Sequence, residues 1–325
     1  MKPLTFSILR LLSDGNFHSG EALAQYLGVS RASISNGLKT LGELGVNIYK
    51  IRGRGYCLQD PLQWLDKQLI LDFLGTSAKD FNIEVHDVMD SSNSLLLQDA
   101  SKGLEHRSCY VVELQLQGRG RRGRAWHMNL GGALTFSLLW RFNQCAGYLS
   151  GLSLAVGVAL VRSLRDLGLV GVALKWPNDV LYQYQKMAGI LIELQGDVLG
   201  PSAAVIGIGL NLRLSPSVRC KIDQAVTDFS TVSGEMPDRN AVLASLLINI
   251  NEVLRVFEKS GFSALRNEWI SYHVYHNRSV RILMPGGETR EGDVIDVDID
   301  GSLVVKTSIG KERFSSGEIS LRGSL

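Results

Sequence analysis

The spacing of the apolar residues changes twice along this chain, and this constrains the fold more than any other feature of the sequence. Before Pro61 apolar residues recur at helical spacing, from Pro61 strand-like and helix-like stretches alternate, and from residue 279 only short apolar runs remain. Each pattern needs a core of its own, and 325 residues exceed what one core usually serves. We therefore predict an α+β protein of several domains, divided into residues 1–62, 63–276 and 277–325.

Residues 1–62 have the pattern of a winged helix-turn-helix. Their helical spacing predicts three helices, the second capped by Ser19 and stopped by Gly28, and the third capped by Ser30. Two short helices joined by a tight glycine turn are typical of helix-turn-helix domains. A hairpin with its turn at residues 52–55 would follow as the wing. The predicted buried stripe of the third helix is Ile34, Leu38 and Leu41.

The excess positive charge of the chain lies in the same segment. Residues 1–60 hold 7 Lys and Arg against 4 Asp and Glu, whereas residues 61–278 hold 21 against 20 and residues 279–325 hold 6 against 8. Short polar and basic side chains on the outward face of the third helix can reach base edges and phosphates. Gly37 lowers the stability of this helix by about 1 kcal/mol relative to Ala. The alternative interpretation of residues 1–62 is a small helical domain used for protein contacts. The residues predicted to contact DNA are Arg31, Ser33, Ser35, Asn36 and Lys39 in the helix, and Arg52 and Arg54 in the wing.

The last segment of the chain predicts a small β domain. Short apolar runs at residues 280–283, 294–297 and 303–305 are separated by Pro285-Gly286-Gly287 and by Asp300-Gly301. Short strands with glycine turns between them are typical of a small barrel, here of about five or six strands.

Three features favour a protein of the reducing cytoplasm. The scattered cysteines Cys57, Cys109, Cys145 and Cys220 form no C-x-x-C pair, which predicts buried, reduced thiols. The first residues lack the apolar core and cleavage site of a signal peptide. No charge lies between Arg141 and Arg162, but the polar residues there favour a strand end followed by a buried helix over a membrane span.

Residues 118–124 are the most unusual stretch, with four arginines and three glycines in seven residues. Glycines let a backbone approach an anion closely, and guanidinium groups hold phosphate or carboxylate with two parallel hydrogen bonds. A disordered nucleic-acid-binding tract is the alternative, but such tracts are long and repetitive. Apolar strands flank this brief stretch at residues 110–112 and 133–136, so we predict an ordered loop over an anionic ligand.

Two further motifs carry candidate ligand-binding groups. Asp179 precedes a predicted turn, and Lys186 opens an apolar strand beside the small residues Ala188 and Gly189, where its side chain can reach into a pocket. A solvated lysine on an edge strand is an equally good interpretation of Lys186. At residues 207–211 (Gly-Ile-Gly-Leu-Asn), the glycines permit close approach and the asparagine offers an amide to a ligand.

These motifs occur in the order seen in biotin–protein ligases, which the chain resembles over almost its whole length. Residues 90–93 (Asp-Ser-Ser-Asn) resemble the Asp-Ser-Thr-Asn segment of that family, whereas Leu116-Gln117 departs from the usual Gln-Ala before the arginine-rich loop. The helix-turn-helix and the sequence Gly-Glu-Ile-Ser-Leu-Arg at residues 317–322 are similar to bifunctional members that are ligase and biotin operon repressor. The resemblance implies a winged helix-turn-helix, a central mixed-sheet α/β ligase domain and a C-terminal SH3-like β-barrel.

The resemblance also implies a two-step acyl transfer. The biotin carboxylate attacks the α-phosphate of MgATP to give biotinyl-5′-AMP and pyrophosphate, and a lysine amine of a carrier protein then displaces AMP. Two anions have to meet in the first step, so preorganised cations are needed where charge develops. By this resemblance Lys186 and Arg121 are catalytic. The residues expected at biotin are Ser91, Ser92, Asn93, Gln115, Arg119, Gly120, Arg121 and Lys186, and those expected at the nucleotide are Arg124, Trp126, Asn178, Asp179 and Asn211.

The implied ligands are biotin, ATP and Mg²⁺, with no metal held by the protein alone. The implied partners are the biotin carboxyl carrier protein of acetyl-CoA carboxylase and operator DNA, which a cytoplasmic homodimer would bind when it holds biotinyl-5′-AMP as co-repressor. One alternative is a ligase whose N-terminal module no longer binds DNA, and another is a biotin-sensing repressor without catalysis. A lipoate-attaching enzyme is a weaker alternative, because such enzymes lack the helix-turn-helix and the arginine-rich loop.

Overall fold

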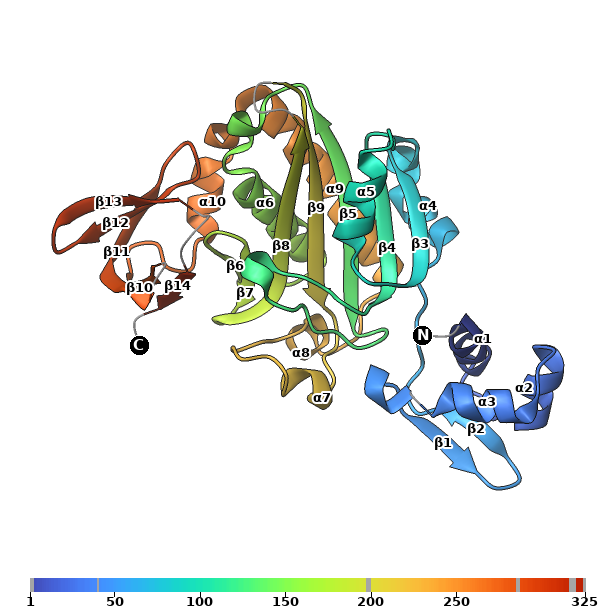
Figure 1. The fold of residues 1–325 in the computed structure, drawn as a ribbon. Coiled ribbons are helices and arrows are strands. Elements are labelled where there is room, and N and C mark those ends of the chain that lie inside the picture. The colour runs from blue at the N-terminus through green and yellow to red at the C-terminus, as the bar shows by residue number, and fades with distance from the viewer. Residues whose placement is uncertain (1–2, 40, 197–199, 285–286, 316–319, 324–325) are drawn as a thin grey trace.

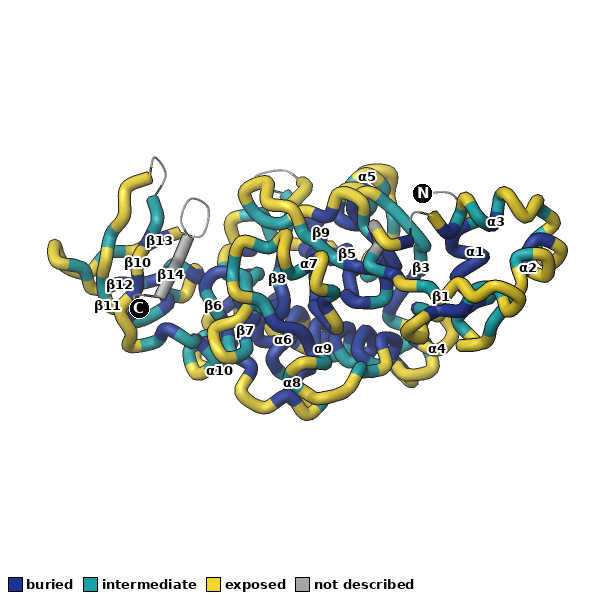
Figure 2. The backbone as a smooth tube through the Cα atoms, turned by 90° about the horizontal axis from the view of Figure 1, so that it is seen from below, coloured by how far each residue is buried: buried dark blue, intermediate teal, exposed yellow. Residues whose placement is uncertain are grey.

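The computed structural model describes residues 3–39, 41–196, 200–284, 287–315 and 320–323. Figure 1 shows three parts in chain order: small helices with a hairpin, a central sheet with helices, and a C-terminal sheet. The first and last parts lie at opposite ends of the central one (Figures 1 and 2). The predicted α+β class is confirmed, whereas the domain limits 1–62, 63–276 and 277–325 stay predictions.

The N-terminal part is a helix-turn-helix followed by a hairpin. As predicted, the side chains of Ser19 and Ser30 cap helices, since each accepts a hydrogen bond from the amide three residues later. Leu41 is buried, but the third helix ends at Leu38, so the predicted helix was too long. The elements are α1 (Pro3–Leu12), α2 (Gly20–Tyr26), α3 (Arg31–Leu38), the 3₁₀ helix η1 (Leu41–Leu44), β1 (Ile48–Ile51) and β2 (Gly55–Leu58).

Gly37 sits where α3 packs against α1. A Cβ atom on Gly37 would lie 3.0 Å from Cδ1 of Ile8, tighter than ordinary van der Waals contact. The Thr5 hydroxyl donates to the Gly37 carbonyl at 3.4 Å from the same side. The glycine therefore lets the two helices approach, which offsets its low helix propensity.

The central part is a seven-stranded mixed sheet in the order β3-β4-β5-β9-β8-β7-β6. Only β3 and β4 pair in parallel, and the remaining neighbours are antiparallel. The strands are β3 (Asn82–Met89), β4 (Ser108–Gln115), β5 (Ala133–Phe142), β6 (Val172–Lys175), β7 (Asp179–Tyr182), β8 (Gln185–Gly196) and β9 (Ser202–Asn211).

Helices cover the two faces of this sheet unequally. On one face α4, α6 and α9 form the main core with alternate residues of the strands, including Val111, Leu138 and Ile206. Their neighbours Tyr110, Leu139 and Val205 point to the other face and pack under α5. The helices are α4 (Lys67–Leu74), α5 (Ser92–Ala100), α6 (Leu152–Asp166), α7 (Pro216–Arg219), α8 (Phe229–Ser233), α9 (Arg239–Ser260) and α10 (Arg266–Tyr272), with η2 (Gly75–Asp80), η3 (Arg121–Gly123), η4 (Ala146–Leu149) and η5 (Phe262–Ala264) as 3₁₀ turns.

The uncharged stretch between Arg141 and Arg162 is the end of β5, the turn η4 and the buried helix α6, as predicted. Among the described residues one helix, α9, is long and apolar enough to cross a membrane. However, 67% of its most apolar window is buried inside the protein, and Figure 2 shows it as a core helix beside α6.

The C-terminal part is a five-stranded antiparallel sheet in the order β13-β12-β11-β10-β14. Its closure into an SH3-like barrel stays a prediction. Two sequence features fall partly beyond the described residues: Pro285 and Gly286 of the predicted turn, and residues 317–319 of the 317–322 motif. The strands are β10 (Ser279–Leu283), β11 (Thr289–Val297), β12 (Leu303–Thr307), β13 (Gly310–Phe314) and β14 (Ser320–Gly323).

The cysteines are unpaired in the structure, but they are not all buried. Cys57 and Cys109 are buried, Cys145 is partly exposed and Cys220 is exposed. The prediction of buried thiols is therefore wrong for Cys220, which follows the short surface helix α7.

The N-terminal part is joined to the central sheet through Trp64. The Trp64 indole donates to the Ser13 hydroxyl at 2.7 Å, and the Arg10 guanidinium lies 4.5 Å from the Trp64 ring centroid. Arg10 also forms an ion pair with Asp87 of β3. These contacts tie α1 to the edge strand of the central sheet.

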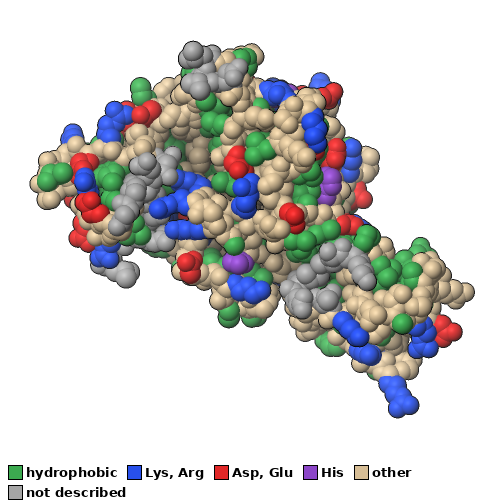
Figure 3. All heavy atoms as spheres, viewed as in Figure 1, with side chains coloured by type: hydrophobic (Ala, Val, Ile, Leu, Met, Phe, Trp, Pro, Cys, Tyr) green, Lys and Arg blue, Asp and Glu red, His purple; other side chains and the backbone are tan. Residues whose placement is uncertain are grey.

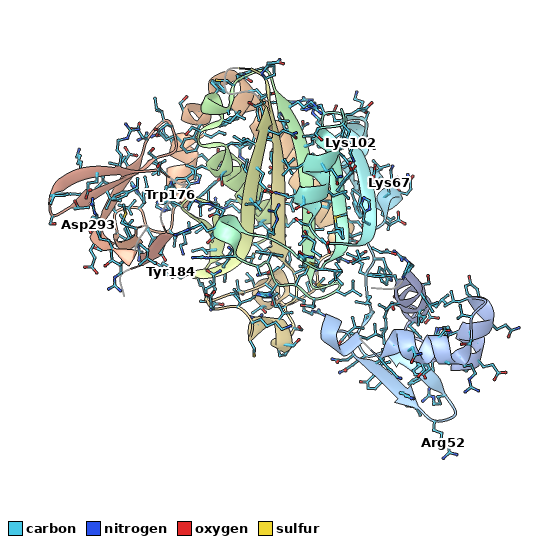
Figure 4. All side chains as sticks on the ribbon, in the orientation of Figure 1. Arg52, Lys67, Lys102, Trp176, Tyr184 and Asp293 are labelled. Carbon is cyan, nitrogen blue, oxygen red and sulfur yellow. The ribbon has the colours of Figure 1, made fainter. Side chains whose placement is uncertain are left out.

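Trp176 contacts the C-terminal part, and His273 lies buried shortly before that part in the chain. Trp176 lies between the two parts (Figure 4) and donates from its indole to the Gly301 carbonyl at 2.9 Å. His273 follows α10, is 7% exposed, and stacks on Trp269 with 4.6 Å between ring centroids. Burial lowers the pKa of His273 from the ordinary 6.5 to about 3.

His273 is expected to make the fold acid-sensitive. The pKa of His273 is lower in the folded state than in the unfolded state. Its contribution to the free energy of unfolding is therefore intact above about pH 6.5 and is lost as the pH falls toward 3. At pH 5 the loss is about 2 kcal/mol. Urea denaturation at pH 7.5 and pH 5 should therefore show a smaller difference in unfolding free energy for His273→Phe than for the parent. An equal difference in the two proteins would contradict this account.

Candidate functional site

A cavity of about 370 Å³ lies against β7, β8 and β9, under the arginine-rich loop. Every residue that the sequence analysis assigned to biotin or nucleotide lines it, although these residues come from segments more than 100 positions apart. The shared location is an observation, whereas the individual roles stay predictions. The predicted residues that line the cavity are Ser91, Ser92, Asn93, Gln115, Arg119, Gly120, Arg121, Arg124, Trp126, Asn178, Asp179, Lys186 and Asn211.

The floor of the cavity is formed by glycines of β8 and β9. A Cβ atom on Gly209 would lie 2.4 Å from Cε2 of Trp126, and one on Gly207 would lie 2.2 Å from Oδ1 of Asn93. The predicted close approach at residues 207–211 is therefore made by these two side chains, which lie directly on the sheet.

The arginine-rich loop is ordered, as predicted. The Gly120 amide donates to the Arg124 carbonyl at 2.7 Å, and the Trp126 amide donates to the Gly118 carbonyl at 2.8 Å, so the loop folds back on itself. Arg121 donates to Oδ1 of Asn178 at 3.1 Å, which fixes the loop over the turn before β7. Partial burial lowers the pKa of the Arg121 guanidinium, so this cation is held where water screens it poorly.

Lys186 forms an ion pair with Asp179 across β7 and β8, with 2.7 Å between Nζ and Oδ1. Both side chains are largely buried, at 17% and 15% exposed. The interpretation of Lys186 as a solvated edge lysine is therefore wrong, because at this residue β8 pairs with β7 on one side and with residues 225–227 on the other. Asp179 begins β7, so the tight turn lies before it, at residues 176–178, and not directly after it.

Among the described residues, three buried polar atoms of the lining lack a hydrogen-bond partner, and two of these, Oδ1 of Asn211 and Nε1 of Trp126, also lack an ion pair of the kind that Oδ1 of Asp179 makes with Lys186. The Asn211 amide donates to the Thr227 carbonyl at 3.1 Å, which leaves the oxygen of the same side chain without a donor. Buried polar atoms are normally satisfied, so this acceptor and this donor are suited to a ligand. Stacking of Trp126 on adenine stays a prediction, since its ring lies against Gly189 and Gly209.

Some lining residues escaped the sequence analysis. Residues 221–224 and Val226 follow β9 and border the cavity, held there because the Lys186 amide donates to the Ala225 carbonyl at 2.9 Å. Glu193 of β8 does not line the cavity itself but contacts two residues that do, Arg119 at 3.1 Å and Asn93 at 2.9 Å. No local motif marks these residues, because their proximity arises only when the strands pair.

The predicted DNA-contact residues lie on the N-terminal part with unequal exposure. Arg31 and Asn36 are exposed on α3, and Lys39 is exposed at its C-cap. Ser33 and Ser35 are half-buried, and the Ser33 hydroxyl bonds to that of Ser30. Arg52 extends into solvent from the hairpin turn (Figure 4). Arg54 instead lies 4.3 Å from the ring centroid of Phe17, which orients its guanidinium.

Basic side chains also gather away from this module. On the face shown in Figure 3, a group of Lys and Arg side chains lies where the central part meets the C-terminal sheet. The modest net charge of +2 therefore hides local concentrations of positive charge.

Three family models match successive parts of the chain. An HTH-domain model matches residues 5–57, the model of the biotin/lipoate A/B protein ligase family matches residues 85–211, and the model of the biotin protein ligase C-terminal domain matches residues 275–322. The matches follow the order of the three parts described above.

Two relatives are similar to the chain over nearly its whole length. The bifunctional ligase/repressor BirA of Salmonella typhimurium is 35% identical over 99% of this chain and 98% of its own, and that of Escherichia coli is 34% identical over 98% and 97%. The solved biotin protein ligase from Aquifex aeolicus in complex with biotin and ATP has a TM-score of 0.64 at 28% identity, covering 75% of this chain and 99% of that one. The chain therefore belongs to the biotin protein ligase family, in the group that carries an N-terminal helix-turn-helix domain.

Proposed function

We propose that the protein is an ATP-dependent, AMP-forming biotin ligase and a biotin-controlled repressor. In the first step the biotin carboxylate attacks the α-phosphate of ATP, and pyrophosphate leaves. In the second step the ε-amine of a carrier-protein lysine attacks the carbonyl of biotinyl-5′-AMP, and AMP leaves. The carrier we propose is the biotin carboxyl carrier protein of acetyl-CoA carboxylase.

The cations of the cavity suit the first step. Lys186 and Arg121 would hold the biotin carboxylate and the adenylated phosphate together, because their charges offset the repulsion between the two anions. Asn178 and Asp179 fix these two cations through the contacts at 3.1 Å and 2.7 Å. ATP would enter with Mg²⁺, for which Asp179 and Asp223 are the carboxylates among the described lining residues.

Ser91, Ser92, Asn93 and Gln115 would bind the ring end of biotin on the other side of the cavity. Asn211 and Trp126 lie on the nucleotide side, where their unpartnered atoms are available to ATP. The ordered loop at residues 118–126 would cover the adenylate and protect the anhydride from water.

The observation that carries this proposal is the convergence of all these side chains on a single cavity around the Lys186–Asp179 ion pair. The test is biotin-dependent exchange of labelled pyrophosphate into ATP, measured on the full chain. Exchange that requires biotin supports the ligase. Biotin binding without any exchange would favour the non-catalytic sensor, and exchange with lipoate alone would favour the lipoate-attaching enzyme.

We also propose that one edge of β8 serves both the homodimer and the carrier protein. Residues 192–196 pair with β9 on one side, and no described strand pairs with them on the other. A second cavity of about 230 Å³ adjoins this edge, lined in part by Ile192, Leu194 and Arg121, and Arg121 also lines the main cavity. An unpaired edge invites another strand. A ternary species containing both the dimer and the carrier in sedimentation experiments would contradict a shared edge.

The N-terminal module is proposed to bind the operator of biotin-synthesis genes as the adenylate-bound dimer, in the cytoplasm. Arg52→Ala is expected to lower the magnitude of the slope of log K against log [salt] by about 1 per protomer, because one phosphate contact is lost. Fluorescence anisotropy with operator DNA, biotin and ATP measures this slope. Arg281→Ala, in the remote C-terminal sheet, is the matched control. An unchanged slope for Arg52→Ala would remove the wing from the DNA interface, and absence of operator binding by the parent would remove the repressor role.

A further inference from the structure

Glu193 is the end point of a chain of hydrogen bonds that runs along one wall of the main cavity. It lies on β8, four residues from Gly189 and on the same face of the strand. Its carboxylate accepts from Nδ2 of Asn93 at 2.9 Å and from Nη2 of Arg119 at 3.1 Å. Glu193 therefore touches both the wall at residues 91–93 and the arginine-rich loop.

The chain continues from Asn93 through Ser137 to Ser92. The Ser137 hydroxyl is fully buried on β5 and bonds to Oδ1 of Asn93, and its oxygen lies 2.7 Å from the hydroxyl oxygen of Ser92. The Ser92 amide in turn donates to Oε1 of Gln115 at 2.9 Å. Asn93 and Ser92 are each 3% exposed, so water cannot readily replace any of these bonds.

Counting the hydrogens gives this chain a direction. An ionised carboxylate only accepts, so Asn93 must turn its NH₂ group toward Glu193, where it also donates to the Leu191 carbonyl at 3.3 Å. Oδ1 of Asn93 then accepts the single hydrogen of Ser137. Ser137 has no hydrogen left for Ser92, so in their 2.7 Å contact the Ser92 hydroxyl is the donor, in preference to its longer contact of 3.5 Å with Oε1 of Gln115. The remaining lone pair of Ser92 is left to the cavity as an acceptor.

We propose that Glu193 is a positioning residue that sets this direction, so that Ser92 accepts a hydrogen bond from an N–H group of the ligand. This inference rests on the proposed function, because biotin carries two N–H groups on its ureido ring. Through its second contact Glu193 also anchors Arg119, so the same carboxylate orients the wall and one end of the loop. An amide at this position would lack the charge that holds Arg119 and could present either end to Asn93.

The test uses Glu193→Leu, Glu193→Gln and Ser137→Ala in the full chain, with biotin as the probe. Glu193→Leu is expected to raise both the Kd of biotin, measured by calorimetry, and the KM of biotin in pyrophosphate exchange about tenfold to a hundredfold. The KM of ATP and the kcat at saturating biotin should stay within about threefold, since Glu193 is remote from the reacting atoms. Glu291→Leu, which removes an exposed glutamate–arginine ion pair on β11 of the remote C-terminal sheet, is the matched control and should change neither constant.

Ser137→Ala separates the two roles of Glu193. It breaks the chain between Asn93 and Ser92 but leaves the Glu193–Arg119 ion pair, so the relay predicts a raised KM of biotin for this variant as well. The double variant Glu193→Leu/Ser137→Ala should bind biotin about as weakly as the weaker-binding of the two single variants, because both substitutions remove the same directed chain of hydrogen bonds. The KM of biotin for Glu193→Gln is expected to lie between the values for the parent and for Glu193→Leu.

The results can overturn the inference without touching the proposed function. If the parent binds biotin and Glu193→Leu binds it within twofold, Glu193 is not a positioning residue. If Glu193→Leu is impaired but Ser137→Ala is not, the relay is wrong and only the ion pair matters. If the parent neither binds biotin nor catalyses exchange, the proposed function fails and the inference falls with it. Thermal unfolding without biotin identifies a variant that has merely lost its fold.

Discussion

Replacing Lys186 with methionine is expected to lower kcat for biotin-dependent pyrophosphate exchange by about 10²–10³-fold. Its Nζ lies 2.7 Å from Asp179 inside the cavity, with the side chain only 17% exposed. A fixed cation in such a site acts on charge as it develops, and no water molecule that fills its place is equally preorganised. Methionine has a similar length without the charge, so the substitution removes the electrostatic contribution and largely preserves packing.

The controls separate this role from general damage. Lys102→Met removes a lysine whose ion pair with Asp99 is on the surface, away from the cavity (Figure 4), and should leave kcat unchanged. Asp179→Asn in addition to Lys186→Met removes the carboxylate that the first substitution leaves unpaired. If the double variant regains a rate within tenfold of the parent, the loss in the single variant came from the buried Asp179 charge, and Lys186 is not catalytic.

The features that sequence could predict are those that depend on neighbours in the chain. Ser19 and Ser30 cap helices because a serine side chain reaches the amide three residues ahead, and this geometry is the same in any fold. The arginine-rich loop was predicted to be ordered because apolar strands flank it on both sides, and its internal hydrogen bonds agree.

Features that depend on strand pairing were beyond the sequence. Whether Lys186 faces solvent or a cavity is decided by the pairing of β8 with β7 and with residues 225–227, and the residue pattern was compatible with either. Ser137 and Glu193 meet Asn93 only because β5, β8 and α5 come together, from positions 44 and 100 residues away. The resemblance to a family supplied the expected site residues, but it gave no signal for this supporting network.

Arg239→Met is expected to lower the free energy of unfolding by about 3–5 kcal/mol, because it leaves a carboxylate buried without its partner. Arg239 and Glu113 are 1% and 0% exposed and form an ion pair at 2.6 Å. Arg239 also donates to the Gln63 carbonyl at 2.7 Å, and Glu113 accepts from the Leu65 amide at 2.6 Å. The pair therefore holds the start of α9, strand β4 and the connection from the N-terminal part to the central sheet.

Urea denaturation of the parent and three variants measures this effect. Arg255→Met breaks an exposed ion pair with Asp80 and should cost less than about 1 kcal/mol. Glu113→Leu combined with Arg239→Met should recover much of the loss, because removing both buried charges also removes their desolvation penalty. The recovery will be incomplete, since the Gln63 carbonyl and the Leu65 amide lose their partners. A double variant no more stable than Arg239→Met alone would mean that these backbone contacts, and not the ion pair, dominate the stability of this junction.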